Sequence, residues 1–118
     1  MRLTGAAVVA LLGACASPPG GRLQHVVLVD LADDADIPAM RADSDSRLPL
    51  IPEVRRYVCG TPVDTGRASV SNDYDLGIIV EFDSVEDYKA YLVHPAHQAL
   101  VTAWKPRWKR SYMVDFAP

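Results

Sequence analysis

Cysteine is scarce in this sequence, which has only two in 118 residues, Cys15 and Cys59. The chain also lacks a glycine-rich phosphate loop and the Gly-x-Ser-x-Gly turn of serine hydrolases. Basic residues are not in excess, since 12 Lys and Arg stand against 15 Asp and Glu for a net charge of −3. That balance argues against nucleic acid as the main partner. The composition excludes these classes without naming an activity.

The N-terminus carries an apolar run that is too short to span a bilayer as a helix. A basic start, this run and small residues are typical of a secretory signal peptide over residues 1–14. Leu12-Gly13-Ala14-Cys15 resembles a bacterial lipobox, in which cleavage precedes a cysteine that then receives a lipid. An ordinary cleavage after Ala14 or Ala16 is the alternative. A lipid on Cys15 would leave Cys59 unpaired, as a small buried hydrophobe near the end of a strand.

The segment that begins at the predicted lipidation site is predicted to be a tether between the anchor and the domain. Residues 15–23 contain Ser-Pro-Pro-Gly-Gly, a composition typical of linkers. Ala16 rather than an aspartate follows the cysteine, which in Gram-negative lipoproteins indicates transfer to the outer membrane. We therefore expect a cell-envelope protein that is anchored by lipid and faces the periplasm. Residues 24–118 are long enough for one domain and too short for two.

Hydrophobic periodicity predicts the elements of this domain. Strands are expected at 25–31, within 54–63, at 74–82 and at 110–116. Helices are expected within 33–45, with Asp36 as a cap and Pro38 in the first turn, after the Ser84 capping box, and from Pro95 to Pro106. Together these elements give the order βαββαβ, which is that of a ferredoxin-like fold. The predicted fold class is α+β, a four-stranded antiparallel sheet with helices on one face.

Both faces of this predicted sheet are apolar. In the 74–82 strand Leu76 and Ile78 point one way, but Ile79 points the other way, and Val26 and Leu28 do the same in the first strand. An antiparallel sheet that has helices on one side should be polar on its open side. The chain has no second layer to cover that side, so we expect a homodimer whose sheets pack face to face.

The residues also resemble a known family, the stress-responsive A/B barrel (Dabb) domain, from Gln24 to Phe116. The most specific element is the run Tyr91-Leu-Val-His94-Pro95-Ala96-His97 between two helices. The resemblance implies a dimeric α+β barrel. One member, the plant olivetolic acid cyclase, closes a polyketide chain without a cofactor. Its catalytic Tyr and His correspond to Tyr91 and His97, and its first-strand His to His25.

The resemblance suggests tentative site residues. His97 and Tyr91 are the candidate catalytic pair, the first as a general base and the second as a hydrogen-bond donor to an enolate or carbonyl. His25, Leu76 and Trp104 are candidate ligand-binding residues, although the cyclase has a histidine where this chain has Leu76. The alternative for His97 is a core histidine whose ring nitrogens are hydrogen-bonded to Tyr91 or to a strand carbonyl.

Two other sequence patterns, a histidine spacing and a basic cluster, give weaker evidence for a functional site. His94-x-x-His97, with His25, has a spacing that some metal sites use, but no Cys or carboxylate motif completes a tetrahedral set, so no metal site is predicted. No cofactor is predicted either. The basic cluster Lys105, Arg107, Lys109 and Arg110 is predicted to be a solvated edge, with attraction of an anionic ligand or a lipid headgroup as the alternative.

Three function classes remain open at the level of sequence. The first is a binding module that holds a small apolar or aromatic ligand inside the barrel of the homodimer. The second is a cofactor-free enzyme that uses His97 and Tyr91 for proton transfer on a carbonyl compound. The third is a structural or interaction domain whose barrel is filled by side chains. Only the first two require a solvent-accessible cavity.

Overall fold

The structure, a computed structural model, describes residues 21–118. The predicted signal peptide at 1–14, the lipidation site Cys15 and most of the 15–23 tether lie outside the described residues. Within the described part, no helix has both the length and the apolar character needed to cross a membrane.

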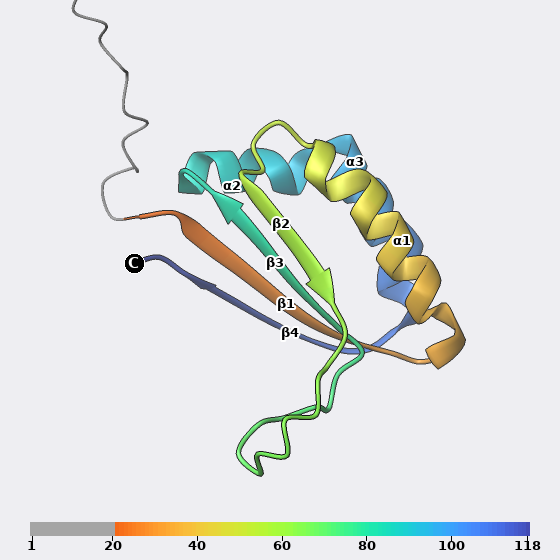
Figure 1. Cartoon of the computed structure of the whole chain (residues 1–118). Coiled ribbons are helices and arrows are strands. Elements are labelled where there is room, and N and C mark those ends of the chain that lie inside the picture. The colour runs from red at the N-terminus through yellow and green to blue at the C-terminus, as the bar shows by residue number, and fades with distance from the viewer. Residues whose placement is uncertain (1–20) are drawn as a thin grey trace, which may run out of the picture.

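Four antiparallel strands form one sheet in the order β2-β3-β1-β4 (Figure 1). Their bounds are Leu23–Leu31 for β1, Arg56–Gly60 for β2, Leu76–Phe82 for β3 and Trp108–Phe116 for β4. The predicted ferredoxin-like α+β fold is confirmed. The third strand begins at Leu76, two residues later than expected. Just before it, the Asp75 carboxylate accepts a hydrogen bond from the Leu31 N–H of β1 at 2.7 Å, so a side chain and not a backbone carbonyl is the partner of that N–H.

Three helices cover one face of the sheet (Figure 1). They are α1 at Ile37–Arg47, α2 at Val85–Val93 and α3 at Pro95–Trp104, with 3₁₀ turns at Asp34–Asp36, Leu48–Leu50 and Lys105–Arg107. The Ser84 hydroxyl caps α2 as predicted, accepting from the Asp87 N–H at 3.0 Å. Asp36 occupies the predicted N-cap position of α1, with Pro38 in the first turn, but its side chain makes no capping hydrogen bond. Instead Asp33 caps the preceding 3₁₀ turn through the Ala35 N–H at 2.9 Å.

The hydrophobic core lies between the helices and the sheet. Alternate residues of β3 from Leu76 to Phe82 and of β1 from Val27 to Leu31 are buried there, as period-two alternation requires. Met40 of α1 and Leu100 of α3 pack on the same cluster. Burial of the strand residues fixes the register in which the strands pair, since a shift of one residue would turn each of those side chains to the open face of the sheet.

The opposite, open face of the sheet is also apolar, as predicted. Val26 pairs with Val114, and Leu28 with Tyr112 across β1 and β4. Tyr112 is 64% exposed and Val114 36% exposed in the single chain. A contiguous apolar face of this kind marks an interaction surface.

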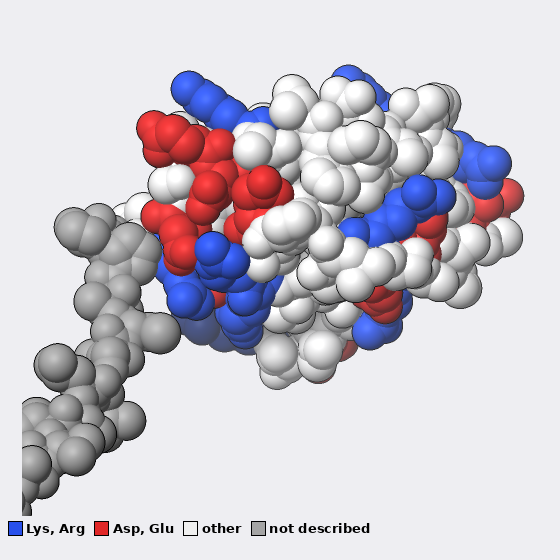
Figure 2. Space-filling view, turned by 90° about the horizontal axis from the view of Figure 1, so that it is seen from above, with Lys and Arg blue, Asp and Glu red and all other residues white. Residues whose placement is uncertain are grey.

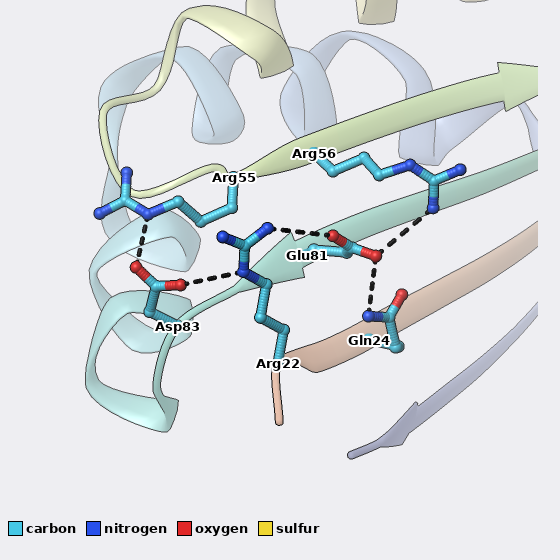
Figure 3. A network of polar contacts seen from close by, with 6 residues as sticks. All are labelled: Arg22, Gln24, Arg55, Arg56, Glu81 and Asp83. Carbon is cyan, nitrogen blue, oxygen red and sulfur yellow. Dashed lines mark hydrogen bonds and ion pairs between the residues drawn. The ribbon is translucent and has the colours of Figure 1, made fainter. Parts of the chain in front are cut away.

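A polar network bounds one end of this open face and ties three strands together (Figure 3). Glu81 of β3 accepts a 2.9 Å hydrogen bond from the Gln24 amide of β1, and its carboxylate lies 3.4 Å from the Arg56 guanidinium of β2. Beside it, the Arg55 guanidinium lowers the pKa of Asp83 by hydrogen bonding. Figure 2 shows acidic and basic side chains lying side by side at one end of the molecule rather than in a patch of one sign.

Candidate functional site

A cavity of about 250 Å³ lies between the sheet and its helices. Strands β1, β3 and β4 and all three helices contribute to its wall, which is mostly apolar: Val27, Met40, Ile78, Leu100 and Met113 are among its lining residues. The volume is slightly below the range of roughly 300–1,000 Å³ that is typical of small-molecule sites. The cavity therefore suits a small ligand.

Polar aromatic side chains gather at one end of the cavity, around His25. This histidine is almost fully buried, and its Nδ1 is 2.5 Å from a carboxylate oxygen of Asp115. The Tyr88 hydroxyl lies 3.2 Å from the same nitrogen. Because the carboxylate accepts from Nδ1–H, the Nε2 of the neutral ring carries the lone pair. Nε2 has no hydrogen-bond partner among the described residues.

The backbone explains why these groups meet. The antiparallel pairing of β1 with β4 places Asp115 directly opposite His25. Residues directly opposite in such a pair have Cβ atoms about 4.5–5.5 Å apart, within reach of a side-chain hydrogen bond. Tyr88 comes from the first turn of α2, whose start is fixed by the Ser84 cap. The site is thus held by a strand pair and a capped helix.

The predicted pair Tyr91 and His97 lies in the same cavity. Their ring centroids are 4.5 Å apart, and the Tyr91 ring is 6.5 Å from that of His25. The His97 Nδ1 donates to the Leu92 carbonyl at 3.1 Å, which turns the ring across the junction of α2 and α3. The structure therefore brings together His25, Tyr91 and His97, and His97 bonds to a helix carbonyl rather than to a strand carbonyl.

Burial sets the protonation of this end of the cavity. Desolvation lowers the pKa of His97, and the neighbouring His25 lowers it further, while the Leu92 hydrogen bond opposes both. Burial raises the pKa of Tyr91, and burial followed by the charge of Asp115 raises the pKa of Tyr88 to about 12. At neutral pH the site presents a neutral His97 and two protonated tyrosines. Its tyrosines can donate hydrogen bonds to a ligand oxygen.

Leu76 and Trp104 do not line the cavity, so the structure places these two predicted ligand contacts elsewhere. Leu76 is fully buried in the core beneath the helices. The Trp104 indole N–H donates to Asp43 at 2.8 Å, which fixes the ring against α1. Both side chains are already engaged in packing between the sheet and helices.

The remaining candidate residues lie outside this site or take other roles. His94 accepts from the Ala96 N–H at 3.1 Å and caps α3. Cys59 forms no disulfide within residues 21–118 and is half-buried in β2. Residues 21–118 contain no cluster of three metal-ligating side chains.

Two residues of the site were missed by sequence reasoning, Asp115 and Tyr88. The alternation of Tyr112, Val114 and Phe116 on one face of the last strand leaves Asp115 on the other face. Its partner could be named only by knowing that β4 lies beside β1. Tyr88 falls at helical spacing with Val85 and Leu92, and such an apolar stripe does not distinguish a packing residue from one that lines a cavity.

The described cavity differs in position from the predicted ligand site. The predicted ligand site was the interior of a barrel formed by two sheets. The cavity that His25, Tyr91 and His97 line lies instead within one chain, on the helix-covered side. The physical reason is that these side chains share the buried face of β1 and of the helices, whereas a barrel of two sheets would be lined by their open faces.

The lowered pKa of His97 predicts its titration. We expect the His97 ring to titrate below the ordinary value of about 6.5 in an NMR experiment, with assignment by substituting His25 and His94 in turn. The unfolded chain then takes up more protons, so stability should fall as pH drops below about 6.5, and less steeply in His97→Asn. A midpoint at or above 6.5 would contradict this prediction.

Comparisons with known proteins agree with this architecture. The chain matches the family described as Stress responsive A/B Barrel Domain, Dabb, over residues 23–118. A comparison with curated proteins finds no match. Among solved structures, a Dabb family protein with a ferredoxin-like fold from Mesorhizobium loti is 23% identical, with a TM-score of 0.71, and the match covers 82% of this chain and 96% of that one.

Two further solved structures share the fold. A dimeric ferredoxin-like protein of unknown function from Thermobifida fusca is 24% identical, with a TM-score of 0.68, over 82% of this chain and 91% of that one. A hydroxynitrile lyase from Passiflora edulis is 16% identical, with a TM-score of 0.72, over 85% and 95%. These similarities establish the fold alone. Because the family match spans nearly all of the described residues, the chain belongs to the stress-responsive A/B barrel (Dabb) domain family.

Proposed function

We propose that this protein binds a small, largely apolar molecule in the cavity between its sheet and helices. The molecule carries an oxygen that accepts a hydrogen bond at the His25 end. The observation that carries the proposal is the cavity itself, apolar along its length and ringed at one end by His25, Tyr88, Tyr91 and His97. A domain filled by its own side chains would leave no such space.

A second candidate function is acid–base catalysis on a carbonyl compound. The observation that favours it is the Asp115–His25 pair, in which the carboxylate fixes the imidazole so that the lone pair of Nε2 can accept a proton. Tyr91 would donate to the carbonyl oxygen as charge develops on it. His25 is favoured over His97 as the base, because the Asp115 carboxylate holds the His25 ring in place, whereas the His97 ring is held by a backbone carbonyl. The similar hydroxynitrile lyase fold is compatible with such chemistry but carries no assignment.

The proposed working form is a homodimer that is anchored in the cell envelope by a lipid on Cys15. The apolar open face supports the dimer, because two such faces pressed together would remove exposed side chains such as Tyr112 and Phe116 from water. The dimeric relative from Thermobifida fusca adds support. The lipobox-like sequence that ends in Cys15 supports the anchor, and Ala16 in place of an aspartate after it supports the outer-membrane location.

Ligand binding is tested with 2-octanone, a neutral carbonyl compound, by NMR. We expect saturable shifts that are confined to cavity residues such as Ile78 and Val80. Val101→Phe places a larger side chain in the cavity wall and should weaken binding at least tenfold, while Thr102→Phe, exposed and next along α3, should leave it unchanged. Equal binding by both variants would contradict the proposed site.

The same experiment in D₂O separates the two candidate functions. An enzyme would exchange the α-protons of bound 2-octanone for deuterium, and His25→Gln would abolish that exchange. A binding module would hold the ketone without exchange above the solvent rate. Binding without exchange therefore supports the first proposal over the second.

The dimer is tested by measuring the mass of the protein by light scattering, with and without a substitution on the open face. We expect twice the mass of one chain for the unchanged sequence and a shift toward one chain for Ile79→Asp, because a carboxylate would be buried without a partner. Val63→Asp is the control, since Val63 is 71% exposed in the loop between β2 and β3. A stable monomer for the unchanged sequence would remove the support that the open face gives to a dimer.

The anchor is tested by detergent phase partition of the protein from its own cells. The unchanged chain should enter the detergent phase, and Cys15→Ala should stay in the aqueous phase because it can carry no lipid. Cys59→Ala, which changes the other cysteine, should behave like the unchanged chain. Aqueous partition of the unchanged chain would be evidence for the ordinary signal peptide instead.

A further inference from the structure

The far end of the cavity, away from His25, is built differently. It is formed where α3 ends and β4 begins, and Lys105, Trp108 and Ser111 line it. Ser111 pairs with Val29 while Asp115 pairs with His25, so four strand residues separate the two ends. At about 3.4 Å per residue this is roughly 14 Å. The cavity is thus elongated, with a polar group available at each end.

Lys105 is the only charged residue that lines the cavity among those described. Within the basic cluster of which it is part, Arg107 pairs with Asp36 at 3.3 Å, and Arg110 with Asp30 at 3.2 Å and with Asp73 at 3.0 Å. Lys105 has no carboxylate within ion-pair distance in residues 21–118. Its ammonium therefore has three donors and no anionic partner.

Trp108 supplies a second, independent observation. Its indole Nε1 is buried and has no hydrogen-bond acceptor in the described part of the chain. A buried donor without an acceptor costs free energy, and native structures rarely keep one without a reason. Ser111, whose hydroxyl can also donate, lines the cavity as well. Three residues that carry hydrogen-bond donors thus line this end, and no acidic side chain is among the described lining residues.

We propose that the cavity binds a small amphiphilic carboxylic acid as its anion, with the carboxylate at Lys105, Trp108 and Ser111. A carboxylate is acceptor-only, with about four lone-pair sites, which suits this set of donors. The hydrocarbon part lies along Val27, Ile78 and Met113 toward His25. This inference rests on the proposed ligand-binding function and deepens it by naming the class of ligand.

The test compares octanoate with 2-octanone, which has the same number of carbons and no charge, by calorimetry at pH 7. We expect octanoate to bind the unchanged chain about tenfold more tightly, the size of effect that one charge-assisted hydrogen bond gives. Lys105→Met should remove that preference and leave the affinity for 2-octanone unchanged. Lys105→Arg should keep most of the preference, since it retains the charge.

Two further variants separate ligand recognition from general effects. Lys109→Met removes the same charge from a neighbouring lysine that does not line the cavity, and should keep the tenfold preference. Trp108→Phe keeps an aromatic ring but removes the N–H donor, and should reduce the preference. A merely structural role of Lys105 at the end of α3 would change the melting temperature without changing the ratio of the two affinities.

The possible outcomes separate failure of this inference from failure of the proposed ligand-binding function. Equal binding of octanoate and 2-octanone, or equal loss in Lys105→Met and Lys109→Met, would overturn the inference and leave the proposed function standing. Acetate that binds as tightly as octanoate would overturn it too, because the site would then be a surface ion site without an apolar part. Failure of both octanoate and 2-octanone to bind would overturn the inference and the proposed function together.

Discussion

The pairing register of β1 with β4 controls both the cavity and the open face of this chain. Val27 lies opposite Met113 and Val29 opposite Ser111, and these four residues share the helix-covered side. The intervening residues share the open side. A shift of one residue would move the Asp115 carboxylate away from His25 and turn the open-face residues of β4 toward the core. Both surfaces are therefore set by one strand pairing.

The cavity survives because β4 is only partly covered by the helices. The inward residues of β1 and β3 are buried, whereas the inward residues of β4, such as Met113, remain accessible. The helices that would have to close over β4 are held elsewhere: α2 and α3 are separated by a single residue, His94, and Pro95 starts the second of them. With α1 against β2 and α2 against β3, a space remains beside β4.

The two ends of that space have opposite electrostatic character. At one end, burial keeps His97 neutral and the tyrosines protonated, and the negative charge there is the Asp115 carboxylate that is hydrogen-bonded to His25. At the other end, Lys105 supplies a cation that no described carboxylate neutralises. An apolar wall separates them. A ligand that satisfies both ends must itself be polar at two places and apolar between, which narrows its chemistry more than fold similarity does.

Local patterns along the chain were enough to predict the order of the elements, the family and the two apolar faces of the sheet. Period-two alternation in β3, the Ser84 cap of α2, and the run from Tyr91 to His97 each lie within one short segment. Tyr91 and His97 could be named together because that single run contains both. His25 could be named only through the family resemblance.

Contacts between distant residues, by contrast, were decided by the folded chain. Asp115 pairs with His25 across 90 positions of the sequence, and Trp104 is fixed by Asp43 across 61. No local pattern encodes those contacts, because they depend on β4 lying beside β1 and on α3 packing against α1. The same is true of the cavity, which is the space left between elements rather than a property of any one of them. The fold could therefore be predicted from the chain, whereas the site is completed only by tertiary packing.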